Sequence, residues 1–202
     1  MRIIGGIYKG LKLRVPKIEG VRPTYDKVRE ALFNILGNRC EGVCFLDLFA
    51  GSGAVGLEAI SRGAEQVVFV ENDKRVVNVL KHNISLFHGV DQSKFRVIHA
   101  DVKKAIPLLR REQKRFDIIF SDPPYIKQHL NRFVLEECVK QGILNADGII
   151  IIEQTVRTYS PMPSNLFLLL EKNYGETKLI FYGRAKYTKF LSISEKRRGN
   201  KR

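Results

Sequence analysis

The chain has 202 residues, of which 44% are hydrophobic, and this length and composition suit one domain with a substantial core. Its 35 Lys and Arg residues exceed 21 Asp and Glu residues, and the resulting net charge of +14 favours a polyanionic partner such as nucleic acid. Apolar runs are too short to cross a bilayer and the start of the chain lacks a signal-peptide core, so we expect a cytoplasmic protein with no membrane partner.

Residues 1–20 contain the run IIGGIYKGLKLRV, which predicts a basic β-hairpin extension ahead of the main domain. The main domain is expected to span residues 21–195, followed by a short basic tail over residues 196–202. A helix is expected to begin after Thr24, a suitable N-cap, because apolar residues recur at helical spacing in YDKVREALFNIL.

The rest of the sequence alternates between short apolar runs and helical stretches. The runs are VCFLDLF, QVVFVE, FRVIHAD, RFDIIFSD and GIIIIEQ, and helices are expected between them over residues 54–62, 74–87, 102–113 and 130–141. This alternation is typical of a doubly wound, Rossmann-like α/β fold, a mostly parallel sheet with helices on both faces. Near the end, ETKLIFYG and TKFLSISE are joined by the short loop RAKY, which predicts an antiparallel hairpin that closes the sheet.

A glycine-rich segment, DLFAGSGAVGLEA at residues 47–59, joins the first strand to the following helix. Gly51, Gly53 and Gly56 form the GxGxxG pattern, which lets the backbone approach an adenosine-containing ligand closely. Glu71 ends the next strand, where a carboxylate can accept hydrogen bonds from both ribose hydroxyl groups. These features fit a nicotinamide cofactor and S-adenosylmethionine equally well.

Asp47 distinguishes between these cofactors. It lies at the strand end, near the place of a dinucleotide's pyrophosphate, and a buried carboxylate there would repel phosphate but pair with an ammonium group. S-Adenosylmethionine has such an ammonium group, a carboxylate that can face the helix N-terminus after Gly53, and no phosphate. Asp101 ends the third strand and is placed to accept from the adenine amino group. Each acid alone is explained as well by a helix cap, but three at successive strand ends favour a cofactor site. The predicted site comprises Asp47, Phe49, Gly51, Gly53, Glu71, Asn72, Asp101 and Val102.

The peptide SDPPY, residues 121–125, follows the apolar run RFDIIF and therefore lies at the carboxyl end of a strand, where open parallel sheets bind ligands. Its two prolines fix the backbone and remove N–H donors, so that Asp122 and the Pro123 carbonyl form a rigid cluster of acceptors. Such acceptors can orient an exocyclic amine toward a sulfonium methyl group, and Tyr125 offers an extruded base a stacking surface. The alternative is a strand that simply ends in a Pro-Pro turn with a capping acid.

The order of FLDLFAGSG, VVFVEND, HAD and SDPPY resembles class I S-adenosylmethionine-dependent methyltransferases that act on exocyclic amines. RIIGGIYKGLKL, VRPTYDKVREALFNIL and DLFAGSGAVGLEAISRGA are similar, more narrowly, to bacterial small-subunit ribosomal RNA guanine-N2 methyltransferases of the RsmD type, which modify guanine(966) of 16S ribosomal RNA. The resemblance is strongest from Arg2 to Tyr125. It implies a seven-stranded sheet with an antiparallel last strand, S-adenosylmethionine as the cofactor, and methyl transfer to N2 of that guanine. Asp122 is a departure, because many amine methyltransferases have Asn there.

Basic residues of the leading segment and of the following helix are expected to contact RNA phosphates. They are Arg2, Lys9, Lys12, Arg14, Arg22 and Arg29. Phosphate contacts position RNA without reading its sequence, so the expected substrate is 16S ribosomal RNA within an assembled or partly assembled small subunit, bound by a monomer. A solvent-exposed charged face is the alternative explanation for Arg22 and Arg29.

Other functions remain open from the residues alone. A nicotinamide-dependent oxidoreductase would explain GSGAVG and Glu71 but neither Asp47 nor DPPY, and a catalytically silent RNA-binding module would explain only the charge. A DNA adenine or protein glutamine methyltransferase would use a similar acceptor cluster, so guanine rests on the family resemblance. The three cysteines and four histidines show no zinc or other metal-ligand spacing, and no metal is predicted.

Overall fold

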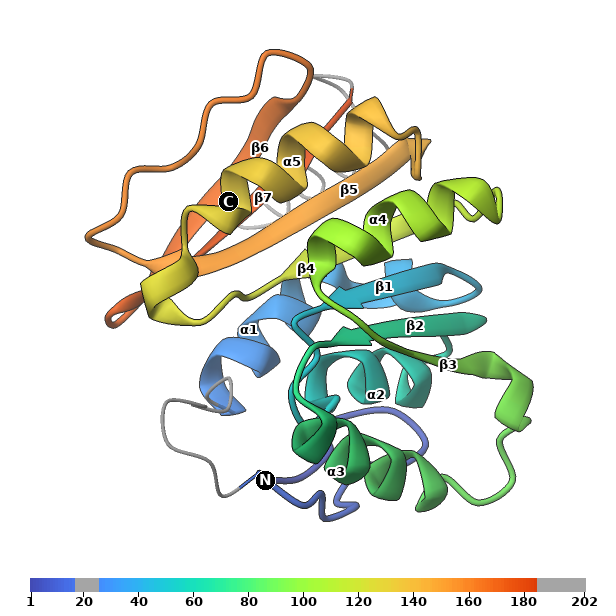
Figure 1. Ribbon diagram of the computed structural model, residues 1–202. Helices are drawn as coiled ribbons and strands as arrows, with labels where there is room; N and C mark the ends of the chain where they lie inside the picture. Colours follow the sequence, from blue (N-terminus) through green and yellow to red (C-terminus); the bar gives the residue numbers. More distant parts are fainter. Residues whose placement is uncertain (17–25, 185–202) are drawn as a thin grey trace.

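A seven-stranded sheet in the order β3-β2-β1-β4-β5-β7-β6 forms the centre of this computed structural model, which describes residues 1–16 and 26–184 (Figure 1). Along the chain the strands are β1 (Cys44–Leu48), β2 (Gln66–Glu71), β3 (Phe95–His99), β4 (Phe116–Ser121), β5 (Leu144–Thr155), β6 (Phe167–Tyr174) and β7 (Thr177–Gly183). Neighbours from β3 to β5 pair in parallel, and β7 runs antiparallel to β5 and β6. The predicted mostly parallel sheet with an antiparallel last strand is therefore confirmed.

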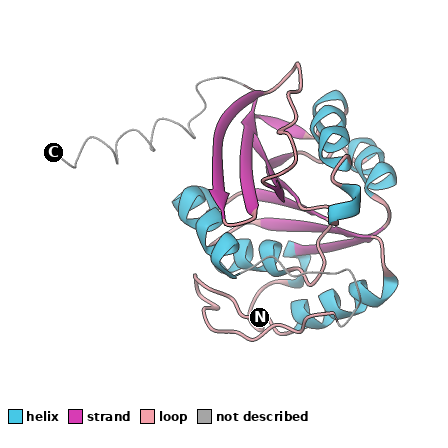
Figure 2. Ribbon diagram, turned by 90° about the vertical axis from the view of Figure 1, so that its left-hand side faces the viewer, coloured by secondary structure: helices cyan, strands magenta, loops and turns pink. Residues whose placement is uncertain are grey.

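Helices cover both faces of this sheet (Figures 1 and 2). They are α1 (Asp26–Leu36), α2 (Ala54–Ser61), α3 (Lys74–Ser85), α4 (Val102–Arg111) and α5 (Leu130–Lys140). Apolar side chains of α1, α2 and α3 share one core with one face of the sheet, while those of α4 and α5 share a second core with the other face. The expected helix starts are explained in part by capping, since Asp73 accepts from the Arg75 N–H and Asp101 from the Lys103 N–H, both at 2.8 Å.

The strand order reverses at β1, which pairs with β2 on one side and β4 on the other. Loops that leave the carboxyl ends of β1 and β4 consequently turn to opposite faces of the sheet and leave a crevice between them. In the register of the sheet, Asp47 lies between Phe69 of β2 and Phe120 of β4. The acid at the end of β1 is thus at the centre of the ligand-binding edge.

The C-terminal hairpin differs from the prediction. β7, which contains most of ETKLIFYG, lies between β5 and β6, so both of its edges are paired. Its hairpin partner is the preceding strand β6, and the predicted partner, TKFLSISE, lies outside the described residues. β6 was missed because it is a largely exposed edge strand with a register shift between Leu168 and Leu170, which breaks the alternation of apolar and polar residues.

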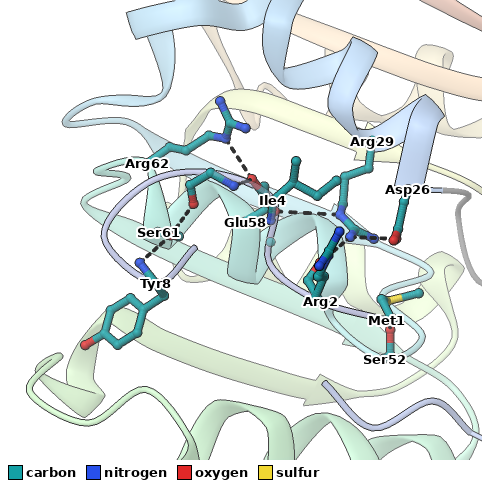
Figure 3. Close-up of polar contacts among 12 residues, drawn as sticks. Met1, Arg2, Ile4, Tyr8, Asp26, Arg29, Ser52, Glu58, Ser61 and Arg62 are labelled. Atoms are coloured by element: carbon teal, nitrogen blue, oxygen red, sulfur yellow. Dashed lines mark hydrogen bonds and ion pairs between the residues drawn. The ribbon is translucent and has the colours of Figure 1, made fainter. Parts of the chain in front are cut away.

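The N-terminal segment, residues 1–14, pairs antiparallel through a bridge between Arg2 and Lys12. It packs on α2, as Figure 3 shows for its contacts with Glu58 and Ser61. The predicted boundaries near residues 20 and 195 lie outside the described ranges. Ile3 and Leu13 are buried in the same core as α1, α2 and α3. In packing terms the segment is part of the main domain.

Glu58 of α2 holds this segment in place. Its carboxylate is fully buried and accepts hydrogen bonds from the backbone N–H groups of Ile4 and Gly5, each at 2.7 Å. It also accepts a hydrogen bond from Arg62 Nε at 2.9 Å. One carboxylate therefore satisfies two backbone donors of a segment that has little regular structure of its own.

The N-terminal segment also packs closely on Ser61, one turn further along α2, and this close contact requires a glycine in the segment. The Ser61 hydroxyl donates to the Gly5 carbonyl at 2.6 Å and accepts from the Tyr8 N–H at 2.9 Å. Gly6 lies between these contacts with a φ of +76°, and a Cβ added there would be 1.8 Å from the Ser61 carbonyl oxygen. Gly10 also has a positive φ, +93°, but nothing lies within 4 Å of its added Cβ.

We predict that Gly6→Ala lowers the free energy of unfolding by at least about 3 kcal/mol, because the added methyl group separates the segment from α2. Gly10→Ala is the matched control and should lose only about 1–2 kcal/mol, the cost of a left-handed backbone at a non-glycine residue. Urea denaturation of the two variants and the parent measures both values. Equal losses in the two variants would contradict the close packing at Gly6.

Candidate active site

A cavity of about 280 Å³ opens at the carboxyl ends of the parallel strands. Its walls include nine of the residues predicted from the sequence: Asp47, Phe49, Gly51, Glu71, Asn72, Asp101, Val102, Asp122 and Pro123. Val15 and Pro16, directly after the N-terminal segment, contribute to another wall. The predicted cofactor residues and the predicted amine-binding residues are therefore brought together around one space.

The glycine-rich loop between β1 and α2 contains three closely spaced residues with a left-handed backbone. Phe49, Gly51 and Gly53 all have positive φ angles, of 62°, 57° and 80°. Phe49 and Gly51 line the cavity, and a left-handed conformation at Phe49 is a strained arrangement of the kind found at binding sites. Gly53 has another role, since its added Cβ would be 2.3 Å from a methyl carbon of Leu80, and it allows α2 to pack closely on α3.

Asp47 lies at the floor of the cavity and is 2% exposed. Burial raises the pKa of its carboxyl well above the ordinary 3.8, the Gly56 N–H that donates to it at 2.9 Å opposes this rise, and the nearby charges of Asp122 and Glu71 add to it. A buried acid beside two other acids is stabilised in its charged form by a cationic ligand. The site therefore favours a ligand that brings a positive charge to the end of β1.

Glu71 and Asp101 are oriented by backbone N–H groups. Glu71 accepts from the N–H groups of Gly51 at 2.9 Å, Asn72 at 2.7 Å and Asp73 at 2.9 Å, while Asp101 caps α4 by accepting from Lys103. A carboxylate has about four acceptor positions, so these bonds leave capacity for a ligand in the cavity. Capping and ligand binding, which are alternatives in the sequence, are compatible in the structure.

The SDPPY segment is anchored by buried hydrogen bonds at the end of β4. The Ser121 hydroxyl donates to the side-chain oxygen of Asn131 at 2.9 Å, and the Asn131 amide donates to the Glu153 carbonyl at 3.3 Å. Asp122 and Pro123 then extend into the cavity wall. The backbone turns at residues 125–127, and the side chain of Tyr125 lies outside what the structure describes.

Glu153, at the carboxyl end of β5, is a cavity residue that was not predicted from the sequence. It is 6% exposed, and burial followed by the charge of Asp122 raises the pKa of its carboxyl well above 4.5. The signal was present in GIIIIEQ, because an acid follows this apolar run as acids follow the runs at Asp47, Glu71 and Asp101.

The basic residues predicted to bind RNA fall into three groups: exposed residues, a residue outside the described ranges, and a buried residue, Arg29. Arg2, Lys9, Lys12 and Arg14 are exposed on the N-terminal segment, and Arg22 lies outside the described residues. The Asn83 side chain accepts from the Arg14 N–H at 2.8 Å and donates to the Ser52 carbonyl at 2.9 Å. This places the exposed basic segment next to the glycine-rich loop.

Arg29, the third group, requires a correction, because its side chain is fully buried and cannot contact RNA phosphates. Its guanidinium donates to the Arg2 carbonyl at 2.6 Å and to Asp26 at 3.0 Å, and it lies 3.7 Å from Glu58. The sequence does contain a signal for this, since Arg29 has helical spacing with Phe33, which is also buried. Arg29 is a structural residue that joins α1, α2 and the N-terminal segment.

A comparison of the whole chain with known families gives a match between residues 1–183 and the model described as "Conserved hypothetical protein 95". The chain belongs to this family, the RsmD family. It is 36% identical over 189 residues to ribosomal RNA small subunit methyltransferase D of Escherichia coli (strain K12), covering 91% of this chain and 90% of that protein. It is also 36% identical over 181 residues to the protein of the same name from Haemophilus influenzae, covering 87% and 89% of the two chains.

The RsmD family assignment agrees with solved structures. The putative methyltransferase yhhF from Escherichia coli superimposes with a TM-score of 0.77 at 35% identity, covering 93% of this chain and 99% of that one. Within the described part of the chain, no helix is long and apolar enough to cross a membrane. Nor do residues 1–16 and 26–184 contain a cluster of three or more His, Cys, Asp or Glu side chains suited to a metal ion.

Asp47→Asn is predicted to stabilise the ligand-free protein near neutral pH, because Asn keeps an acceptor for the Gly56 N–H and removes a buried charge. The folded-state pKa of Asp47 is raised, so the parent protein loses stability as pH rises through that pKa. The advantage of the variant should therefore shrink as the pH is lowered and Asp47 becomes neutral. Urea titrations at several pH values measure this, and an advantage that grows toward acid would contradict the assignment.

Proposed function

We propose that the protein transfers a methyl group from S-adenosylmethionine to the exocyclic N2 of a guanine, guanine(966), in the 16S ribosomal RNA of the small ribosomal subunit. The observation that carries this proposal is the shared cavity: acids at the ends of β1, β2 and β3 lie across from the Asp122–Pro123 acceptors at the end of β4. The names of its relatives support the coarser statement, methylation of small-subunit ribosomal RNA.

The cavity suits S-adenosylmethionine because acids at the ends of β1, β2 and β3 can each bind a different part of the cofactor. Asp47 would pair with the ammonium group, Glu71 would accept from the ribose hydroxyls, and Asp101 would accept from the adenine amino group. The burial of Asp47 in a cavity that also contains Glu71 and Asp122 is the structural observation that favours a cationic group over a pyrophosphate. When bound, the cofactor supplies an electrophilic methyl group on a sulfonium centre.

On the other side of β1, Asp122 and Pro123 act on the amine. The nitrogen of a base amine is a poor nucleophile because its lone pair is delocalised into the ring. Hydrogen bonds from its two N–H groups to the Asp122 carboxylate and the Pro123 carbonyl direct the lone pair away from the ring plane. The same acceptors stabilise the positive charge that develops on nitrogen during transfer, and the proton leaves to Asp122 or to water.

The basic face of the N-terminal segment supports RNA as the substrate. Arg2, Lys9, Lys12 and Arg14 are exposed, and the chain directly after them contributes Val15 and Pro16 to the cavity wall. Phosphates bound along this segment would bring one extruded nucleotide to the cavity. Selection of the nucleotide then depends on the shape of the RNA and of the proteins assembled on it.

We predict that Asp122→Ala slows single-turnover methyl transfer to unmethylated small subunits by at least about a hundredfold with little change in S-adenosylmethionine affinity, because the hydrogen bond from the amine matters mainly in the transition state. Asp122→Asn keeps an acceptor oxygen and should retain more activity. Asp147→Ala is the matched control, an exposed acid near the start of β5, and should behave as the parent. Equal activity of Asp122→Ala, Asp122→Asn and the parent would rule out the amine-orienting role.

A second prediction concerns the basic segment. Replacing Arg2, Lys9, Lys12 and Arg14 together by Gln should weaken subunit binding and lower the slope of log affinity against log salt, by about 0.7 for each phosphate that is no longer bound if single-strand behaviour applies. Binding of S-adenosylmethionine should be unchanged.

The control for this variant is a second quadruple replacement on or near α4, which packs on the opposite face of the sheet. It changes Lys104, Arg110, Arg111 and Arg115, all exposed, and lowers the net charge equally. Only the first variant should change the salt slope. The same slope in both variants, or efficient methylation of short naked RNA, would contradict recognition through the N-terminal segment.

A further inference from the structure

Glu153 lies beside Asp122 at the ends of two neighbouring strands. The register of β4 and β5 pairs Ser121 with Ile152, so the next residues along the two strands are Asp122 and Glu153. Both line the cavity, and the Asn131 side chain connects the two strand ends through Ser121 and the Glu153 carbonyl. These acids lie on the side of β1 away from β2 and β3, which is the side proposed for the target base.

The neighbouring strands place acidic residues beside Glu153 in the cavity wall. Its backbone pairs with Leu179 of β7, and the charged cavity residues nearest to it in the sheet are Asp122 on β4 and Asp47 on β1. Among the described residues that line the cavity, Lys127 supplies the positive charge, and its side chain is exposed. One carboxylate oxygen of Glu153, Oε2, is buried and has no hydrogen-bond partner within residues 1–16 and 26–184.

Two carboxyl groups placed side by side do not both ionise readily, and the more buried one keeps the proton. Glu153 is buried, whereas Asp122 is partly exposed. Burial, and then the charge of Asp122, raise the pKa of Glu153, in agreement with this division. The pair therefore presents a hydrogen-bond donor, the protonated Glu153, next to an acceptor, the ionised Asp122.

We propose that Glu153 orients the target base by donating a hydrogen bond from its uncharged carboxyl group to the ring nitrogen next to the methylated amine. This inference rests on the proposed function, with Asp122 accepting from the amine itself. In guanine the N2 amine has the acceptor N3 on one side and the donor N1–H on the other, so a donor at Glu153 selects the N3 side. Uracil has no exocyclic amine, so it offers no amine nitrogen for methylation between these two carboxyl groups.

The first experiment compares Glu153→Gln and Glu153→Ala. Gln is nearly the same size as a protonated Glu and can donate from its amide, so its single-turnover rate on unmethylated small subunits should stay within about threefold of the parent. Ala removes the donor and should lower the rate by about tenfold or more, with unchanged S-adenosylmethionine affinity by calorimetry. Glu65→Gln, an exposed acid on another surface, is the control.

Each alternative result overturns the inference. A rate for Glu153→Gln as low as that for Glu153→Ala means that an ionised carboxylate is required. A parent-like rate for Glu153→Ala means that the residue does not orient the base. A fall in cofactor affinity that matches the fall in rate assigns Glu153 to the cofactor. Parent protein that methylates no small-subunit RNA refutes the proposed function as well, and so is distinguishable from these results.

A second measurement detects the proton on the Glu153 carboxyl group directly and does not depend on enzyme activity. Infrared spectra of the parent at neutral pH should contain a protonated-carboxyl band that shifts in D₂O and is lost in Glu153→Gln, but remains in Glu65→Gln. Asp47→Asn is the control for the other buried acid with a raised pKa, and the band assigned to Glu153 should remain in that variant. A difference spectrum in which Glu153→Gln loses an ionised-carboxylate band instead would overturn the inference.

Discussion

The buried carboxylate of Glu58 is the interaction on which the position of the N-terminal segment depends. It binds two backbone N–H groups of the segment, at Ile4 and Gly5, and forms ion pairs with Arg62 and Arg29 (Figure 3). Removing one partner of a buried ionic group leaves an uncompensated charge, at a cost of about 3–5 kcal/mol. The segment, α1 and α2 are therefore held as one unit, although the segment contains no named strand.

This arrangement determines what surrounds the glycine-rich loop. Because residues 1–14 are fixed on α2, Asn83 can join Arg14 to Ser52, and Val15 and Pro16 reach the cavity. The end of the basic segment that carries Arg14 consequently lies next to the glycine-rich loop of the proposed cofactor site. A structural contact far from the reacting atoms thus aligns the proposed RNA-binding surface with the cavity.

The cavity itself combines acids that would repel one another without a ligand. Asp47 and Glu153 are both buried, and the charge of Asp122 raises the pKa of each. In the proposed function a cationic cofactor favours ionised Asp47, while Glu153 remains neutral and donates a hydrogen bond. Similar residues at adjacent strand ends therefore have different roles, which burial and neighbouring charges decide.

The sequence by itself determined the alternating fold, the glycine-rich loop and the acids at the ends of β1 to β4, because these depend on local spacing and on the end of each apolar run. Tertiary structure decided the rest. Arg29 looked available for RNA, but the helix turns it toward Glu58, and β6 was hidden by its exposure and register shift. The run GIIIIEQ shows an acid near a strand end, but only the pairing of β5 beside β4 places Glu153 next to Asp122, because strand order and register are long-range properties that no local pattern encodes.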